Sequence, residues 1–250
     1  MIAHESTEAA TDPTAVDTDP ELIRAFLAAL VPGVYEIRIP EPRKPRFWHT
    51  QAMYLQLPDD LEAGARMIAS VSGHDAAAVY IVGNPVNPAL LGRGRAGFHR
   101  ALSTASDADV IARRLLYVDI DAERPARINA TPEEAAAAMV RTAAAAAWLG
   151  AELAFPEPLF HGTSGSGGML LYRLDLPNDA AAEEQVRGCL AALAERFPAD
   201  GVKIDTGVYN AARIFRVPGT VNAKSTTPQP DRPWSLVTGT LAEGEGVRNG

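Results

Sequence analysis

Two aspartates that close an apolar run are the first residues in this sequence that could do chemistry. Residues 115–118 lead into Asp119 and Asp121, which are separated by one position. On a β-strand, successive side chains point to opposite faces, so the two aspartates share a face while Val118 and Ile120 point into a core. Two carboxylates on one face repel each other unless a proton or a cation lies between them. Such oxygen ligands suit Mg²⁺ or Mn²⁺, and a strand end with two solvated acids is the simpler alternative.

A third aspartate and several basic residues follow farther along the chain. Asp205 ends the short apolar stretch 202–205, and Arg213, Arg216 and Lys224 come after it. Three carboxylates can hold two divalent cations, and guanidinium and ammonium groups can neutralise a triphosphate. A turn-forming aspartate before Thr-Gly and a solvated strand face for the arginines are the alternatives.

A glycine loop lies between these two regions. Residues 164–168 read Ser-Gly-Ser-Gly-Gly and precede the apolar stretch 169–174. A loop of this kind lets backbone N–H groups approach phosphate oxygens, although most glycine loops before a strand are simple turns.

Taken together, the three segments resemble one known family. Their order is Asp-Ile-Asp at 119–121, Ser-Gly-Ser-Gly at 164–167, and a lone Asp205 followed by Asn-Ala-Ala-Arg at 210–213 and Gly-Thr at 219–220 before Lys224. This order and spacing is similar to the archaeo-eukaryotic primase superfamily, and within it to the primase-polymerase domains of bacterial plasmids, phages and mobile elements. The similarity covers about residues 75–235 and includes the strand-like stretch ending in Asn84-Pro85.

The resemblance implies template-dependent nucleotidyl transfer by a DNA primase or polymerase. Asp119, Asp121 and Asp205 would bind two Mg²⁺ or Mn²⁺ ions and form the catalytic centre. The partners would be a single-stranded nucleic-acid template, a primer and an NTP or dNTP, in the replication of a plasmid, phage or mobile element. The sequence has no G-x-x-x-x-G-K-[ST] phosphate loop, so a helicase would be a separate protein or another part of the gene product.

The resemblance also implies two sets of binding residues. The nucleotide would be contacted by Ser164, Gly165, Ser166, Gly167, Met169, Arg213 and Lys224. The nucleic acid would be contacted by Arg93, Arg95 and Arg216, for which a solvated loop or strand face is the alternative.

Met169 departs from the family pattern, which has a histidine at this position of the second motif. Methionine carries no charge and donates no hydrogen bond, so it cannot replace a histidine that contacts nucleotide phosphates. Either nucleotide binding is weakened, or a neighbour such as His161 substitutes, or synthesis is impaired. Two alternatives to a polymerase therefore remain: a nucleotide- or nucleic-acid-binding module with lost or reduced activity, and a metal-dependent nuclease.

The pattern of elements favours an α+β fold. Predicted strands and helices are interleaved, and several strand pairs are joined by short turns, which is typical of a mixed or antiparallel sheet. We expect an acidic disordered tail over residues 1–18, a single catalytic domain over 19–240 and a frayed tail over 241–250. Within that domain we expect an N-terminal α/β unit at about 19–110 and an RRM-like core at about 111–240.

Composition is compatible with this interpretation. The formal net charge of −8 is concentrated in residues 1–21, which hold six acidic and no basic residues. Residues 201–240 hold five basic and two acidic residues, a net charge of +3, so the local field does not exclude a polyanion. The single cysteine, Cys189, rules out an internal disulfide and a cysteine-based zinc site. No signal peptide or membrane span is recognisable, and we expect a cytoplasmic protein.

Overall fold

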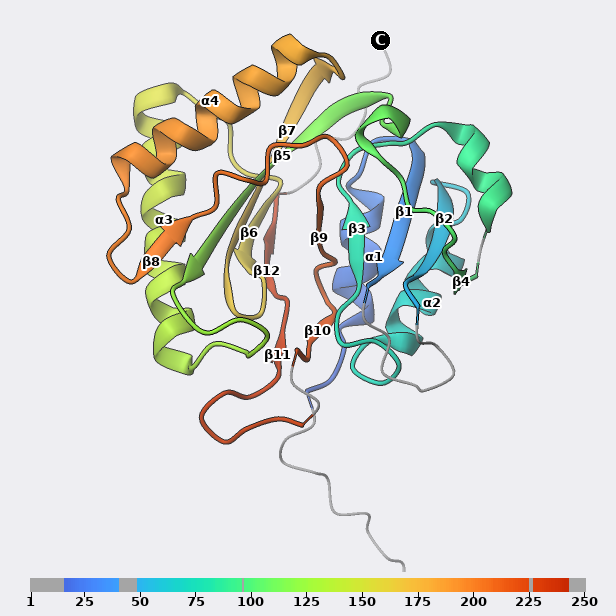
Figure 1. Cartoon of the computed structure of the whole chain (residues 1–250), viewed down its shortest axis with the longest axis horizontal. Helices are drawn as coiled ribbons and strands as arrows, with labels where there is room; N and C mark the ends of the chain where they lie inside the picture. The colour runs from blue at the N-terminus through green and yellow to red at the C-terminus, as the bar shows by residue number, and fades with distance from the viewer. Residues whose placement is uncertain (1–15, 41–48, 96, 225–226, 243–250) are drawn as a thin grey trace, which may run out of the picture.

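The computed structural model of the chain describes residues 16–40, 49–95, 97–224 and 227–242. Most of the predicted acidic tail and of the predicted frayed C-terminus lies outside these residues. Two five-stranded sheets stand side by side, and two helices pack on each of them (Figure 1).

The first sheet has the strand order β4-β2-β1-β3-β9, and every pairing in it is antiparallel. Its strands are β1 (Gly33–Ile39), β2 (Gln51–Leu57), β3 (Tyr80–Val82), β4 (His99–Arg100) and β9 (Ile214–Arg216). Helices α1 (Pro20–Ala28) and α2 (Leu61–Val71) pack on this sheet. Phe26 of α1 and Ile68 of α2 are fully buried in the same cluster as Ile37 and Leu55 of the strands.

The second sheet has the order β12-β6-β7-β5-β8 and is also antiparallel. Its strands are β5 (Ala112–Ala122), β6 (Phe160–Thr163), β7 (Gly167–Pro177), β8 (Val202–Ile204) and β12 (Gly239–Leu241). Its outer face is covered by α3 (Pro132–Leu153) and α4 (Ala180–Arg196), as Figure 1 shows. A small two-stranded sheet of β10 (Val221–Asn222) and β11 (Ser235–Leu236) and the 3₁₀ turns Pro88–Arg93 and Asp107–Asp109 complete the fold.

The alternation along β5 divides the core in two. Val118 and Ile120 pack with Leu190 and other residues of the two outer helices. Leu115 lies in the other cluster, together with Phe215 of the first sheet. The face of β5 that carries Asp119 and Asp121 is therefore the face turned toward the first sheet.

Local signals in the sequence explain where the helices begin. The Asp19 side chain accepts a hydrogen bond from the Leu22 N–H at 2.9 Å, and Pro20 occupies the first position of α1. At α3, Thr131 and Glu134 form the capping box that the sequence predicts. Gly150 does not end this helix, because α3 continues to Leu153 and Ala154 provides the left-handed cap with φ of 52°. An interior glycine costs only about 1 kcal/mol, which burial of Leu149 offsets.

The predicted α+β class with an antiparallel sheet is confirmed. The two sheets do not correspond to two consecutive stretches of the chain that meet near residue 110. Strand β9, at residues 214–216, pairs with β3 and so belongs to the first sheet. In the part of the chain that the structure describes, no helix is both long and apolar enough to cross a bilayer.

Candidate active site

The three aspartates lie together at one edge of the second sheet. Asp119 and Asp121 occupy the same face near the end of β5. Ile120 pairs with Ile204, and the Asp205 N–H donates to the Asp119 carbonyl at 2.9 Å, so Asp205 lies directly opposite Asp119. Side chains that are directly opposite on antiparallel strands share a face, with Cβ atoms about 5 Å apart. By the same register, Lys203 lies opposite Asp121.

Each of these carboxylates already has a protein partner. Arg124 donates to Asp121 Oδ1 at 3.2 Å, and the Gly207 N–H donates to Asp205 Oδ1 at 2.8 Å. The Tyr117 hydroxyl hydrogen-bonds to the Asp119 side chain. Among the described residues, no three His, Cys, Asp or Glu side chains converge into a ready-made metal site. Arg124 contacts Asp121 through Oδ1, so the other carboxylate oxygen of Asp121 is not part of this ion pair.

The electrostatics at Asp119 reflect this crowding. Burial, and next the charge of Asp121, raise the pKa of Asp119 to about 7, and Asp205 adds to the rise. The hydrogen bond from Tyr117 and the charge of Arg216 act in the opposite direction. A carboxyl group held this way loses its proton more readily when a cation lies beside it. The donor set therefore fits divalent cations by its chemistry, although not yet by its side-chain geometry.

Basic side chains from three separate segments surround the aspartates. Arg216 of β9 is 9% exposed, donates to the Ser164 carbonyl at 3.1 Å and lies over the Tyr80 ring at 5.4 Å. Burial lowers the pKa of Lys224 to about 8, and the charges of Arg216 and Arg124 lower it further. Asp121 and Asp119 partly counteract this effect. Lys224 thus lies close enough to both basic and acidic groups for their charges to shift its pKa.

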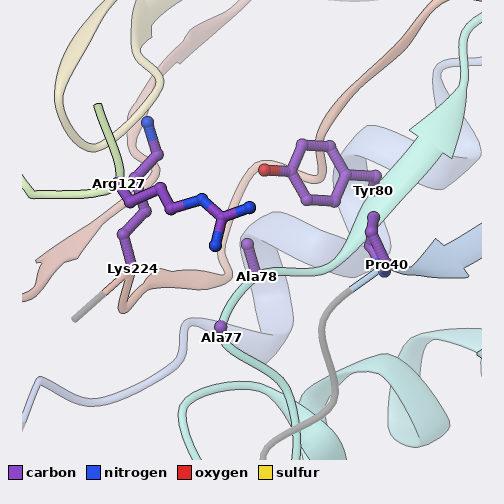
Figure 2. A pocket seen from close by; sticks show the side chains of 6 residues that line it. All are labelled: Pro40, Ala77, Ala78, Tyr80, Arg127 and Lys224. Atoms are coloured by element: carbon purple, nitrogen blue, oxygen red, sulfur yellow. The ribbon is translucent and has the colours of Figure 1, made fainter. Parts of the chain in front are cut away.

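Two pockets open beside this cluster and share two side chains. The first, here called the carboxylate pocket, has a volume of about 480 Å³ and is lined by residues 121–128, Lys203 and Lys224. The second, here called the tyrosine pocket, has a volume of about 200 Å³ and is lined by Pro40, Ala77, Ala78, Tyr80, Arg127 and Lys224. In Figure 2 the Tyr80 hydroxyl points across the tyrosine pocket toward Arg127 and Lys224. Arg127 and Lys224 therefore form the boundary between the two pockets.

The predicted glycine loop is a tight turn between β6 and β7. Ser164 and Ser166 are buried, and the Ser166 hydroxyl accepts from Asn222 Nδ2 at 2.8 Å. The Ser164 N–H donates to the Gly167 carbonyl and the Gly165 N–H to Thr163 Oγ1. A Cβ at Gly167 would collide with the Asp121 carboxylate. In this conformation the loop's hydrogen bonds point inward, and its glycine makes room for Asp121.

Met169 lies directly across from Asp119 in the β5–β7 ladder and is fully buried. It belongs to the cluster of Leu115 and Phe215, so no part of its side chain reaches either pocket surface. His161 pairs with Leu170, whose side chain packs with the outer helices. Because the two faces of a sheet alternate, His161 points away from Asp119 and cannot stand in for the family's histidine.

The remaining predicted binding residues are scattered. Arg213 donates to the Gly207 carbonyl at 2.5 Å, which ties it to the loop after Asp205. Arg93 hydrogen-bonds to Tyr54 on β2, and Arg95 forms a two-pronged ion pair with Asp60, its Nη2 3.0 Å from Asp60 Oδ1. Both lie near β2, which the strands β1 and β3 separate from β9 and the aspartates. The structure does not bring Arg93 or Arg95 to the site.

Several residues of the site are not singled out by the sequence. They reach it from strands and a loop that flank the motifs, and they are Tyr80, Tyr117, Arg127 and Lys203. Arg124, by contrast, follows Asp121 by three positions and belongs to the first motif, although the sequence does not predict its ion pair with Asp121. Arg127 has a φ of 64°, a conformation that non-glycine residues rarely adopt and that only the structure reveals.

No protein-family model and no curated protein sequence matches this chain. It is similar to the solved structure of primase RepB′, with 15% identity and a TM-score of 0.45 over 91% of this chain and 57% of that one. This chain thus spans little more than half of that structure. It is also similar to the polymerase domain of ligase D from Mycobacterium tuberculosis in complex with DNA, with 18% identity and a TM-score of 0.46 over 90% and 81% of the two chains.

A third similar structure is the catalytic domain of primase RepB′ in complex with initiator DNA. It has 14% identity and a TM-score of 0.43 over 92% of this chain and 87% of that one. All three are structures of primase or polymerase proteins.

Proposed function

We propose that this protein is a primase-polymerase that transfers nucleotides to a primer on a single-stranded template. The observation that carries the proposal is the arrangement of Asp119, Asp121 and Asp205 on one sheet face beside Arg216 and Lys224. Three carboxylates with no basic group near them would suit a simple cation site. Their combination with buried cations suits a reaction in which a metal-bound triphosphate is attacked and pyrophosphate leaves.

Each residue of the site has a definite task in this proposal. Asp119, Asp121 and Asp205 would hold two divalent cations. When bound, the two ions would activate the primer 3′-hydroxyl and neutralise charge on the triphosphate. Lys224 and Arg124 would contact phosphate oxygens and stabilise the leaving pyrophosphate. Tyr117 would fix the orientation of the Asp119 carboxylate.

The proposal gives the glycine loop a supporting task. Gly167 leaves space for Asp121, and the Ser164 carbonyl holds Arg216 in place. Nucleotide contacts from Ser164, Gly165, Ser166 and Met169 would need a different conformation of this turn. The product as DNA or RNA, a role in replicating a mobile element, and cooperation with a separate helicase are further parts of the proposal.

Primer-extension and de novo priming assays with Mg²⁺ or Mn²⁺ test this function. We expect extension by the wild type and a loss of at least about a hundredfold in Asp119→Asn and Asp205→Asn, since each removes a charged metal ligand. Asp175→Asn is the matched control, because Asp175 lies on β7 with an 89% exposed side chain and outside the site. Template degradation would indicate a nuclease instead. Nucleotide binding without any product would indicate a binding module.

A further inference from the structure

The tyrosine pocket combines features that no predicted motif explains. Its wall contains an aromatic ring, two cations and three small apolar side chains, and none of its six lining residues is acidic. Arg216, anchored to the Ser164 carbonyl at 3.1 Å, lies over the Tyr80 ring and adds a third cation next to the pocket. An aromatic ring among cations is the combination that binds a nucleotide base together with its phosphate.

The described residues that line the tyrosine pocket include no carboxylate, and this favours one of two nucleotide ligands. A nucleoside triphosphate enters such an enzyme with its divalent cation, and it needs carboxylates nearby to receive that ion. Asp121 lines the carboxylate pocket and none of the tyrosine pocket's lining residues is acidic. A backbone phosphodiester of a single strand needs no metal and pairs directly with lysine and arginine.

The conformation of Arg127 also favours a backbone phosphodiester as the ligand of this pocket. Its φ of 64° is unfavourable for a residue with a side chain, at a cost of about 1 kcal/mol or more. The turn it adopts places its guanidinium in the pocket opposite the Tyr80 hydroxyl (Figure 2). Strain of this kind persists where the position of the side chain matters.

We infer that the tyrosine pocket binds one nucleotide of the single-stranded template, with its phosphate between Arg127 and Lys224 and its base or sugar against Tyr80. This inference rests on the proposed function, because it places the template beside the carboxylates. Since Lys224 lines both pockets, it would contact template phosphate on one side and the incoming nucleotide on the other. The template would then approach the aspartates from the side of β3.

Fluorescence anisotropy in EDTA tests the inference without any turnover. The probe is a fluorescein-labelled thymidine oligonucleotide, titrated with the full chain at several KCl concentrations. We expect Tyr80→Leu to raise the Kd about tenfold, because one stacked base is lost. We expect Arg127→Gln to reduce the slope of log K against log salt by about 0.7, the value for one phosphate of a single strand. Arg196→Gln, an exposed change at the end of α4, is the matched control.

A second titration separates the two possible ligands. Binding of dTTP with Mn²⁺ should be unchanged in Tyr80→Leu, because Tyr80 lines the tyrosine pocket and not the carboxylate pocket. Arg127 lines both pockets, so Arg127→Gln is judged by the oligonucleotide. An unchanged oligonucleotide Kd in folded Arg127→Gln, or a loss of dTTP binding in folded Tyr80→Leu, would overturn the inference. If Tyr80→Leu does not fold, Arg127→Gln alone decides. Failure of the proposed function is distinguishable, because it would abolish primer extension by the wild type while the Arg127-dependent binding of the oligonucleotide persists.

Discussion

At the scale of single residues, the site is a balance between repelling acids and the cations that surround them. Asp119 meets Asp121 along its own strand and Asp205 across the ladder. Tyr117 and Arg216 offset only part of that repulsion. Natural active sites commonly give up stability for such an arrangement. The amount given up depends on pH, because it exists only while Asp119 is charged.

This dependence predicts how Asp119→Asn changes stability. The folded-state pKa of Asp119 is raised to about 7 from the ordinary 3.8. Its protonation therefore favours the folded state at low pH, and this contribution is lost as pH rises from about 4 through about 7. Asparagine stays neutral, so we expect the variant to gain free energy of unfolding relative to the wild type across this window. At pH 8 the gain should be about 1–2 kcal/mol after allowance for solvent screening.

Urea unfolding in EDTA at pH 4, 6 and 8 measures this gain. Asp175→Asn is again the control. It removes an exposed ion pair with Arg114, so we expect its difference from the wild type to change by less than about 1 kcal/mol over this pH range. A variant that is equally stable or less stable than the wild type at pH 8 would contradict the crowding of the carboxylates.

At the scale of elements, the orientation of β7 determines where Met169, which stands in place of the family's histidine, lies in the structure. The sequence predicts this strand and the turn before it, and it predicts the aspartates at the ends of their strands. It does not predict that Met169 faces the closed cluster between the two sheets. Burial of one face depends on which other element packs there, and no local pattern of β7 contains that information. For the same reason, the sequence does not predict which face of the sheet His161 lies on.

We therefore expect Met169→His to destabilise the protein without increasing primer extension. An imidazole at this fully buried position would lose apolar packing and find few hydrogen-bond partners besides Asp119. The cost in free energy of unfolding should be about 1–3 kcal/mol. Met169→Leu, which conserves volume and polarity, should cost less than about 1.5 kcal/mol and leave extension unchanged. Thermal unfolding and extension kinetics of the two variants provide the comparison, and faster extension by Met169→His would show that this side chain reaches the nucleotide.

At the scale of the whole molecule, β9 ties the two sheets together. It pairs with β3 in the first sheet, and Phe215 at its centre contacts Phe26 of α1 and Tyr117 of β5. Helix-capping residues and the alternation of apolar and polar residues predict most helices and long strands of the two sheets. They cannot predict this return of the chain, because β9 has only three residues and its partner lies more than a hundred positions earlier. The placement of Arg216 near Asp119 is therefore a product of long-range pairing.

We expect Phe215→Ala to weaken both halves of the molecule together. Phe215 is 2% exposed, its ring centroid is 6.1 Å from that of Phe26 and 5.3 Å from that of Tyr117, and its loss should cost about 3–5 kcal/mol. Hydrogen exchange should accelerate in β1 and β3 as well as in β5 and β7. Phe155→Ala is the matched control, because Phe155 contacts Tyr172 on the outer side of the second sheet. Its effect should be confined to β7, α3 and α4. If exchange after Phe215→Ala rises in one sheet only, the two sheets open independently, and β9 does not couple them.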